Sequence, residues 1–243
     1  MKTLWIFGDS FSTRFDHNNL HDNHRRYMEI MGISEIKTWS DSLAEKLGCE
    51  LKNLARGGDS NYQTFQNICD NCHEINEDDI VIVGWGLITK FRISYDNQFV
   101  NIHPQGEIKD YGSLSKETIQ EILDNRLKDL RYSGKRDRYA EEVNMWEKVI
   151  SVLAKNKKFE VYFWSSEEER LINCEPNKHK NKSNYLYKDS KEPLIHYVRK
   201  KGCTTMEDET NGLVSDSHFG VGGHNKLADI FYDEIKNLKL RYV

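Results

Sequence analysis

Short strand-like runs alternate along this sequence with longer amphipathic stretches, and this alternation restricts the fold more than any other feature. The predicted strands are Leu4–Phe7, Glu50–Leu54, Ile80–Val83 and Phe159–Trp164. The third run contains no polar side chain, which is typical of a strand that is covered on both faces. Strands that alternate with helices in this way predict an α/β fold with a mostly parallel sheet.

The stretches between these runs carry apolar residues at helical spacing. In the last of them, Leu227, Phe231 and Ile235 fall on one face. The expected helices are Trp39–Leu47, Tyr62–Ile75, Lys116–Leu130, Tyr139–Ala154 and Gly223–Leu238. No repeat or linker is visible, so we expect a single domain over residues 1–243, with insertions around 95–135 and 167–195.

Composition narrows the classes of function. The 35 basic and 39 acidic residues give a formal charge of -4, so the chain lacks the basic field that non-specific nucleic-acid binding requires. No apolar run approaches the ~18–20 residues of a membrane span, and Leu4–Phe7 is shorter than a signal-peptide core of ~7–15 residues. The 5 cysteines fit free thiols. We therefore expect a cytoplasmic protein with no nucleic-acid partner, and its oligomeric state stays open.

Gly8-Asp9-Ser10 follows the first predicted strand directly. In an open parallel sheet, functional groups gather beyond the carboxyl ends of the strands. A serine that opens the next helix lies beside unpaired backbone N–H groups, which makes Ser10 a candidate nucleophile. The plain alternative is that this serine only caps a turn.

A second polar segment, Asn53–Asn61, follows the second strand and contains a glycine pair. A glycine lets the backbone approach a ligand closely, so the N–H of Gly58 is a candidate donor to a developing oxyanion. The alternative is an ordinary loop in which Asp59 or Ser60 caps the following helix.

The third segment, Asp216-Ser217-His218, comes just before the last helix. A carboxylate two residues from a histidine can reach its Nδ1, which fixes the tautomer that leaves Nε2 free as a base. A single histidine in such a turn would more often be structural, but the neighbouring aspartate favours a reactive pair.

Taken together, Gly8-Asp9-Ser10, Gly58 and Asp216-Ser217-His218 resemble the motifs of the SGNH (GDSL-type) hydrolase family, in order and over nearly the whole chain. The resemblance implies a flavodoxin-like three-layer α/β/α sandwich and a serine ester hydrolase of the esterase or acetylesterase type. Ser10 would be the nucleophile, His218 the base and Asp216 its orienting carboxylate, with the N–H groups of Ser10 and Gly58 binding the oxyanion. No metal and no organic cofactor would be needed.

The substrate that this resemblance implies is a small-molecule or glycan ester, such as an O-acetyl group. Three segments are similar to the bacteriophage-encoded members of the family, which would allow an association with a virion: Asn53–Asn61, Val81–Arg92 and Glu207–His218. Acyl chain length and the role of the 167–195 insertion stay open.

One departure from the family pattern affects the activity. The family usually carries an asparagine after the third strand that donates to the oxyanion, whereas this chain continues Gly84-Trp85-Gly86 without one. Loss of one such donor typically costs ~10²–10³ in rate. Thr89 or Asn61 are candidates for the missing donor, and the alternative function is a weakly catalytic or non-catalytic binding module.

The same region supplies candidate substrate-binding residues. Trp85 would wall the pocket and Arg92 would bind a polar or anionic acyl group. Asp9 and Asn61, in the segments after the first two strands, are further substrate-binding candidates. The alternatives are core packing for Trp85 and a surface charge for Arg92.

Three histidines, His17, His21 and His24, recur at a spacing that would align them on one helical face. A metal site is one interpretation, but the surrounding Asn and Asp favour a solvated loop beside the active site. We expect no metal here, and we expect Asp208 and Glu209 to be a surface pair.

Overall fold

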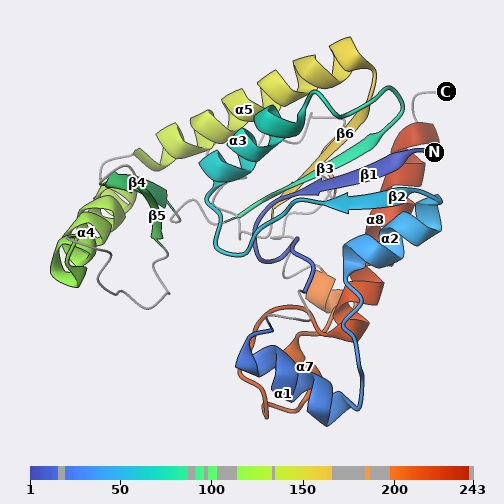
Figure 1. Ribbon diagram of the computed structural model, residues 1–243, viewed down its shortest axis with the longest axis horizontal. Helices are drawn as coiled ribbons and strands as arrows, with labels where there is room; N and C mark the ends of the chain where they lie inside the picture. The colour runs from blue at the N-terminus through green and yellow to red at the C-terminus, as the bar shows by residue number, and fades with distance from the viewer. Residues whose placement is uncertain are drawn as a thin grey trace.

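Four parallel strands form the central sheet in the part of the chain that the computed structural model describes. The described residues are 1–15, 20–86, 91–95, 98–102, 114–132, 135–165, 184–186 and 198–240. The strands are β1 (Thr3–Phe7), β2 (Glu50–Asn53), β3 (Ile80–Trp85) and β6 (Glu160–Ser165), in the order β2-β1-β3-β6. This parallel order, with β1 between β2 and β3, agrees with a flavodoxin-like sheet (Figure 1).

The strands β1, β3 and β6 bury both of their faces, as the unbroken apolar run of β3 predicts. Leu4 and Ile6 of β1 belong to one apolar cluster, whereas Trp5 and Phe7 belong to another on the opposite face. Side chains alternate across a strand, so β1, β3 and β6 each contribute to both clusters. All six residues of β3 are buried.

Helices cover both faces of the sheet (Figure 1). The helices α2 (Trp39–Leu47) and α8 (Val221–Leu240) pack on one face, where Trp39 and Phe231 meet edge to face. The helices α3 (Asn61–Asn71) and α5 (Lys135–Lys157) cover the other. The expected three-layer α/β architecture is therefore confirmed.

The region of the first expected insertion forms its own small unit. A hairpin of β4 (Phe91–Tyr95) and β5 (Gln98–Ile102) is separate from the central sheet, and α4 (Lys116–Tyr132) lies beside it. These elements share a small apolar cluster around Ile102 and Leu123. Of the second expected insertion, 167–195, only residues 184–186 belong to the described part of the chain.

Two short helices lie side by side below the sheet in Figure 1, next to the start of α8. They are α1 (Asp22–Met31) and α7 (Met206–Glu209). Tyr27 of α1 and Met206 of α7 belong to one apolar cluster, which also contains Val214. The expectation of a solvated loop is wrong for the segment that α1 occupies. Only Tyr27 of this helix is fully buried, because most of its side chains are polar.

The expected helices agree with the structure except at their ends. α3 stops at Asn71 rather than Ile75, and α5 begins at Lys135 rather than Tyr139. Among the described residues, no helix combines the length and the apolar character that crossing a membrane requires.

Candidate active site

Asp216 and His218 form a hydrogen-bonded pair in the turn before α8. Oδ1 of Asp216 lies 2.7 Å from Nδ1 of His218 and also accepts the backbone N–H of His218 at 2.9 Å. The carbonyls of both residues accept N–H groups from the start of α7, Met206 to His218 and Glu207 to Asp216. The turn is therefore fixed by backbone contacts as well as by the side-chain pair.

The charge state of Asp216 is suited to orienting the imidazole ring of His218. Burial raises the pKa of this carboxyl group, but the hydrogen bonds from the ring and backbone of His218, with the charges of His218 and His24, outweigh it and lower the pKa to about 2. Asp216 is therefore ionised at neutral pH. An ionised partner at Nδ1 keeps the proton there and leaves Nε2 as the acceptor.

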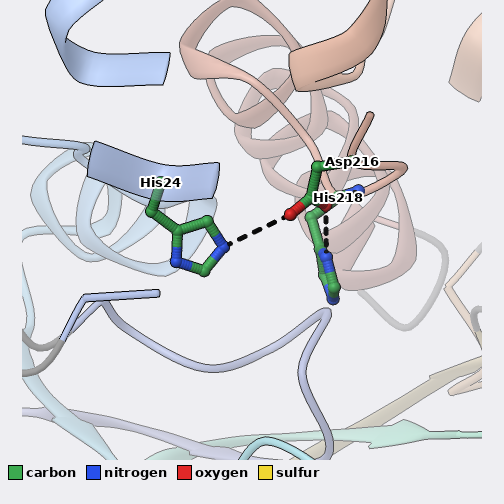
Figure 2. Close-up of side chains that lie close together, drawn as sticks. All are labelled: His24, Asp216 and His218. Atoms are coloured by element: carbon green, nitrogen blue, oxygen red, sulfur yellow. Dashed lines mark hydrogen bonds and ion pairs between the residues drawn. The ribbon is translucent and has the colours of Figure 1, made fainter. Parts of the chain in front are cut away.

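The loop that carries Ser10 lies against this pair. The ring of Phe11, the next residue, is 5.0 Å from the ring of His218, and the blue segment below the imidazole in Figure 2 is this N-terminal part of the chain. Ser10 is half-buried. Neither Oγ of Ser10 nor Nε2 of His218 makes a hydrogen bond to another described residue.

The turn after β1 depends on Gly8, whose φ is +155°. A Cβ at this position would lie 2.6 Å from Oγ of Ser12 and 2.9 Å from the carbonyl oxygen of Gly84. The carbonyl of Asp9 then accepts the N–H groups of Ser12 and Thr13. A glycine is required because the backbone turns sharply and packs against the end of β3.

The loop that contains Gly58 is tied to the Ser10 loop. The N–H of Arg56 donates to the carbonyl of Gly8 at 3.0 Å, and the side-chain amide of Asn53 donates to the carbonyl of Ser12 at 2.8 Å. Gly58 adopts a left-handed conformation with φ +82°. Within the described residues, the N–H groups of Ser10 and Gly58 have no hydrogen-bond acceptor.

Asp9 and Asn61 lie nearly buried beside these loops, and their polar groups bind backbone. Asp9 accepts the N–H of Phe11 at 3.1 Å. Asn61 accepts the N–H of Gly86 at 2.8 Å and donates to its carbonyl at 3.0 Å. The amide of Asn61 thus keeps at most one hydrogen for a bound molecule. The alternative that Ser60 caps this helix is confirmed, since its Oγ accepts the N–H of Gln63.

Trp85 belongs to the core on the α5 side of the sheet. Its side chain has no exposed surface, its Nε1 donates to Glu147 at 3.0 Å, and its ring stacks on Phe163 with centroids 6.3 Å apart. This placement fits the alternative of core packing rather than an open pocket wall.

For several other candidate residues, the structure does not describe the side chain. Thr89 and His17 lie outside the described residues. Arg92 pairs with Asn101 through the backbone of β4, but its side chain is not among those described.

His24 is a site residue that the sequence offered only as one of three regularly spaced histidines, not as a partner of Asp216. It projects from α1, and its Nε2 lies 3.6 Å from Oδ2 of Asp216. Burial lowers the pKa of His24, the charge of Asp216 raises it, and the neighbouring His218 and His21 lower it further. His21 instead caps α1, where its Nδ1 accepts the N–H of Asn23. Of the three histidines, only His24 lies within α1, and its partner Asp216 comes from the other end of the sequence.

Glu209 also differs from its expected surface role. Its carboxylate accepts the N–H groups of Gly222 and Gly223 at the start of α8, together with the hydroxyl groups of Tyr27 and Thr204. It is therefore a cap that joins α1 and α7 to α8. Asp208 belongs to the capping box of α7 with Thr205.

No family model matches this sequence, and no curated protein matches it either. Among solved structures, the chain is similar to protein YxiM from Bacillus subtilis, with 12% sequence identity and a TM-score of 0.49. The match covers 98% of this chain and 57% of that one. The chain thus spans little more than half the length of the solved protein.

Proposed function

We propose that this chain is a serine ester hydrolase of the SGNH type, with Ser10 as nucleophile, His218 as general base and Asp216 as its orienting carboxylate. The observation that carries the proposal is the 2.7 Å contact between Asp216 and His218, directly beside the loop that carries Ser10. Catalytic hydrogen bonds are often long or absent before substrate binds, so the missing Ser10–His218 bond does not weigh against these roles.

The reaction would follow the usual course of a serine hydrolase. Oγ of Ser10 attacks the ester carbonyl while Nε2 of His218 takes its proton, and Asp216 stabilises the imidazolium. The N–H groups of Ser10 and Gly58 would receive the oxyanion. Collapse of the intermediate expels the alcohol, which takes the proton back from His218. Water, deprotonated by the same imidazole, then releases the acid and restores Ser10.

The finer assignment is cleavage of a short acyl group, such as an O-acetyl group on a small molecule or a glycan. Its support is the sequence resemblance, including the segments similar to bacteriophage-encoded family members. The hairpin and α4 stand apart from the central sheet, and we propose that such additions to a single domain determine which substrate is accepted.

A fluorophosphonate probe tests the nucleophile, because it labels an activated serine covalently. We expect labelling of the wild-type chain, none of Ser10→Ala, and strongly slowed labelling of His218→Ala. Ser217→Ala is the matched control, since Ser217 is an exposed serine between the two members of the pair, and it should label normally. Equal labelling of Ser10→Ala and wild type, or full hydrolysis of p-nitrophenyl acetate by Ser10→Ala, would refute the assignment.

The alternative is a binding module that keeps the fold with little or no catalysis. It is favoured by the amide of Asn61, which is engaged by Gly86 instead of facing the site. Residues 84–92, at the end of β3 and directly after it, contain no asparagine to replace it. A folded wild-type protein that neither labels nor hydrolyses the ester would support this second function.

A further inference from the structure

The carboxylate of Asp216 lies between two histidines, one at each oxygen. His218 occupies Oδ1 through Nδ1 at 2.7 Å, and His24 approaches Oδ2 through Nε2 at 3.6 Å. Figure 2 shows the ring of His24 pointing at Asp216 from α1, while His218 comes from the turn before α8. The proposed hydrolysis uses only the first of these contacts, so it leaves His24 unexplained.

The spacing between His24 and Asp216 fits two ligands of one metal ion. A separation of 3.6 Å is too long for a hydrogen bond. Two ligand atoms that each lie ~2.0–2.2 Å from a zinc ion, at a roughly tetrahedral angle, are about 3.3–3.6 Å apart. One ligand atom from each of His24, Asp216 and His218 lies within 4.8 Å of the other two, so a small movement would bring the third atom to the ion.

The donor set also selects the kind of ion. Two imidazole nitrogens and one carboxylate oxygen suit Zn²⁺ and similar transition metals, whereas Mg²⁺ and Ca²⁺ prefer oxygen ligands alone. The side chains of His24, Asp216 and His218 are 18%, 10% and 31% exposed. The cluster is therefore sheltered but still open to solvent, which gives an ion a path of entry and leaves room for water as a fourth ligand.

We propose that His24, Asp216 and His218 form a binding site for one divalent transition-metal ion of the Zn²⁺ type. Nε2 of His24, the carboxylate of Asp216 and Nδ1 of His218 are the ligands. Coordination at Nδ1 replaces the hydrogen bond between His218 and Asp216, and the imidazole proton then resides on Nε2.

This exchange has a consequence that rests on the proposed function. A protonated Nε2 cannot take the proton of Ser10, so bound Zn²⁺ inhibits ester hydrolysis. The same three side chains hold either a metal ion or the proton relay, but not both together.

Cobalt titration tests the site without any need for activity, because Co²⁺ in a four-coordinate site gives intense visible absorption. The wild-type chain should develop these bands at one Co²⁺ per chain, and added Zn²⁺ should abolish them. Loss of groups that only support metal ligands costs ~10–100-fold in affinity, so His24→Ala and Asp216→Asn should each weaken binding at least ~10-fold. The ring of His24 packs against Phe15, with centroids 4.5 Å apart. His24→Gln keeps more side-chain volume there and replaces His24→Ala if the latter does not fold by circular dichroism.

His73→Ala is the matched control, since His73 is an exposed histidine with Glu74 3.9 Å away, and it should bind as the wild type does. No visible bands in folded wild-type protein would overturn the site. Binding that survives in His24→Gln would overturn it too. Near-ultraviolet thiolate bands that persist in that variant would place the ion on cysteine.

Hydrolysis of p-nitrophenyl acetate with and without Zn²⁺ tests the consequence. Zn²⁺ should suppress the wild-type rate, while whatever activity His24→Gln retains should resist the same concentration. A wild-type rate that ignores Zn²⁺ despite saturated cobalt bands would overturn the inhibition. A chain without esterase activity would refute the proposed function, and the cobalt bands would still decide the metal site.

Discussion

Asn61 and Gly86 are joined by two hydrogen bonds that run in opposite directions. The side-chain oxygen of Asn61 accepts the N–H of Gly86 at 2.8 Å, and its amide nitrogen donates to the carbonyl of Gly86 at 3.0 Å. Both residues are buried. The pair anchors the chain where it leaves β3 to the first residue of α3, and it occupies the amide that the sequence offered as an oxyanion donor.

Asn61→Ala should destabilise the protein, because it leaves a buried N–H and a buried carbonyl of Gly86 without partners. An unsatisfied buried group costs about 1–3 kcal/mol, so we expect a loss of that size in the free energy of unfolding. Urea denaturation measures it. Asn71→Ala is the control, since in the part of the chain that the structure describes the amide of Asn71 bonds only within α3, to Asn67. Equal losses in the two variants would contradict a special role for the Asn61–Gly86 pair.

Tyr27→Phe should destabilise the protein by weakening the attachment of α1, the helix that carries His24. The hydroxyl of Tyr27 donates to Glu209 and accepts the N–H of Val221 at 2.8 Å, so it joins α1 to the start of α8. Hydrogen bonds that involve a charged group contribute about 1.5–3 kcal/mol, and we expect a loss in that range. Thermal and urea denaturation measure the effect.

The exposed Tyr62 provides the control for this substitution. Among the described residues its hydroxyl meets only Gln66 on the same helix, so Tyr62→Phe should change the free energy of unfolding by less than ~0.5 kcal/mol. A Tyr27→Phe protein as stable as Tyr62→Phe would show that the Tyr27–Glu209 contact does not hold α1 in place.

The sequence predicted the sheet and the Asp216–His218 pair because both depend on local patterns. The buried β3 is a run of apolar residues, and a carboxylate two residues before a histidine reaches its ring through a single turn. The turn at Gly8 can be predicted for the same reason, since a glycine that follows a strand indicates a sharp turn. The roles of Ser10 and Gly58 in catalysis stay predictions.

The parts that were missed depend on contacts between distant segments. α1 is mostly polar and buries only Tyr27 fully, and this side chain packs in a cluster with Met206 and Val214 from the far end of the sequence. Glu209 looked like a surface carboxylate because nothing nearby in sequence shows that Gly222 and Gly223 present their N–H groups to it. For Trp85 the sequence leaves two interpretations open, because an aromatic residue at a strand end fits a pocket wall as well as a core.

His224 should make the protein sensitive to acid. It is buried; its Nδ1 accepts the N–H of Trp39 at 3.2 Å, and its Nε2 has no partner among the described residues. Burial, with a smaller effect from the charges of His218 and His24, lowers the pKa of His224 to about 3. An unfolded histidine has a pKa of about 6.5. Between these values the unfolded chain binds the proton and the folded chain does not.

The contribution of His224 to the free energy of unfolding is therefore fully present above about pH 6.5. As the pH falls from there toward 3, this contribution is lost by up to ~1.4 kcal/mol per pH unit. His224→Asn removes the titrating group and keeps a side-chain acceptor. Its free energy of unfolding should fall less steeply than that of wild type between about pH 6.5 and 4.5. His73→Gln, at an exposed histidine, should leave the wild-type slope unchanged. Parallel pH profiles for wild type and His224→Asn would contradict the buried, neutral imidazole.

Asp216→Asn should abolish most of the proposed hydrolysis while the protein stays folded. The amide cannot stabilise an imidazolium, and it can turn its N–H₂ toward Nδ1, which would fix the wrong tautomer of His218. A comparable substitution in serine proteases lowers kcat about 10⁴-fold, and we expect a loss of ~10³–10⁴ in kcat with little change in KM. Glu207→Gln is the charge-matched control. The side chain of Glu207 is exposed, and the contact described between this residue and Asp216 is a hydrogen bond from the backbone N–H of Glu207 to the carbonyl of Asp216. Steady-state hydrolysis of p-nitrophenyl acetate measures both variants, and equal kcat values would remove Asp216 from the relay.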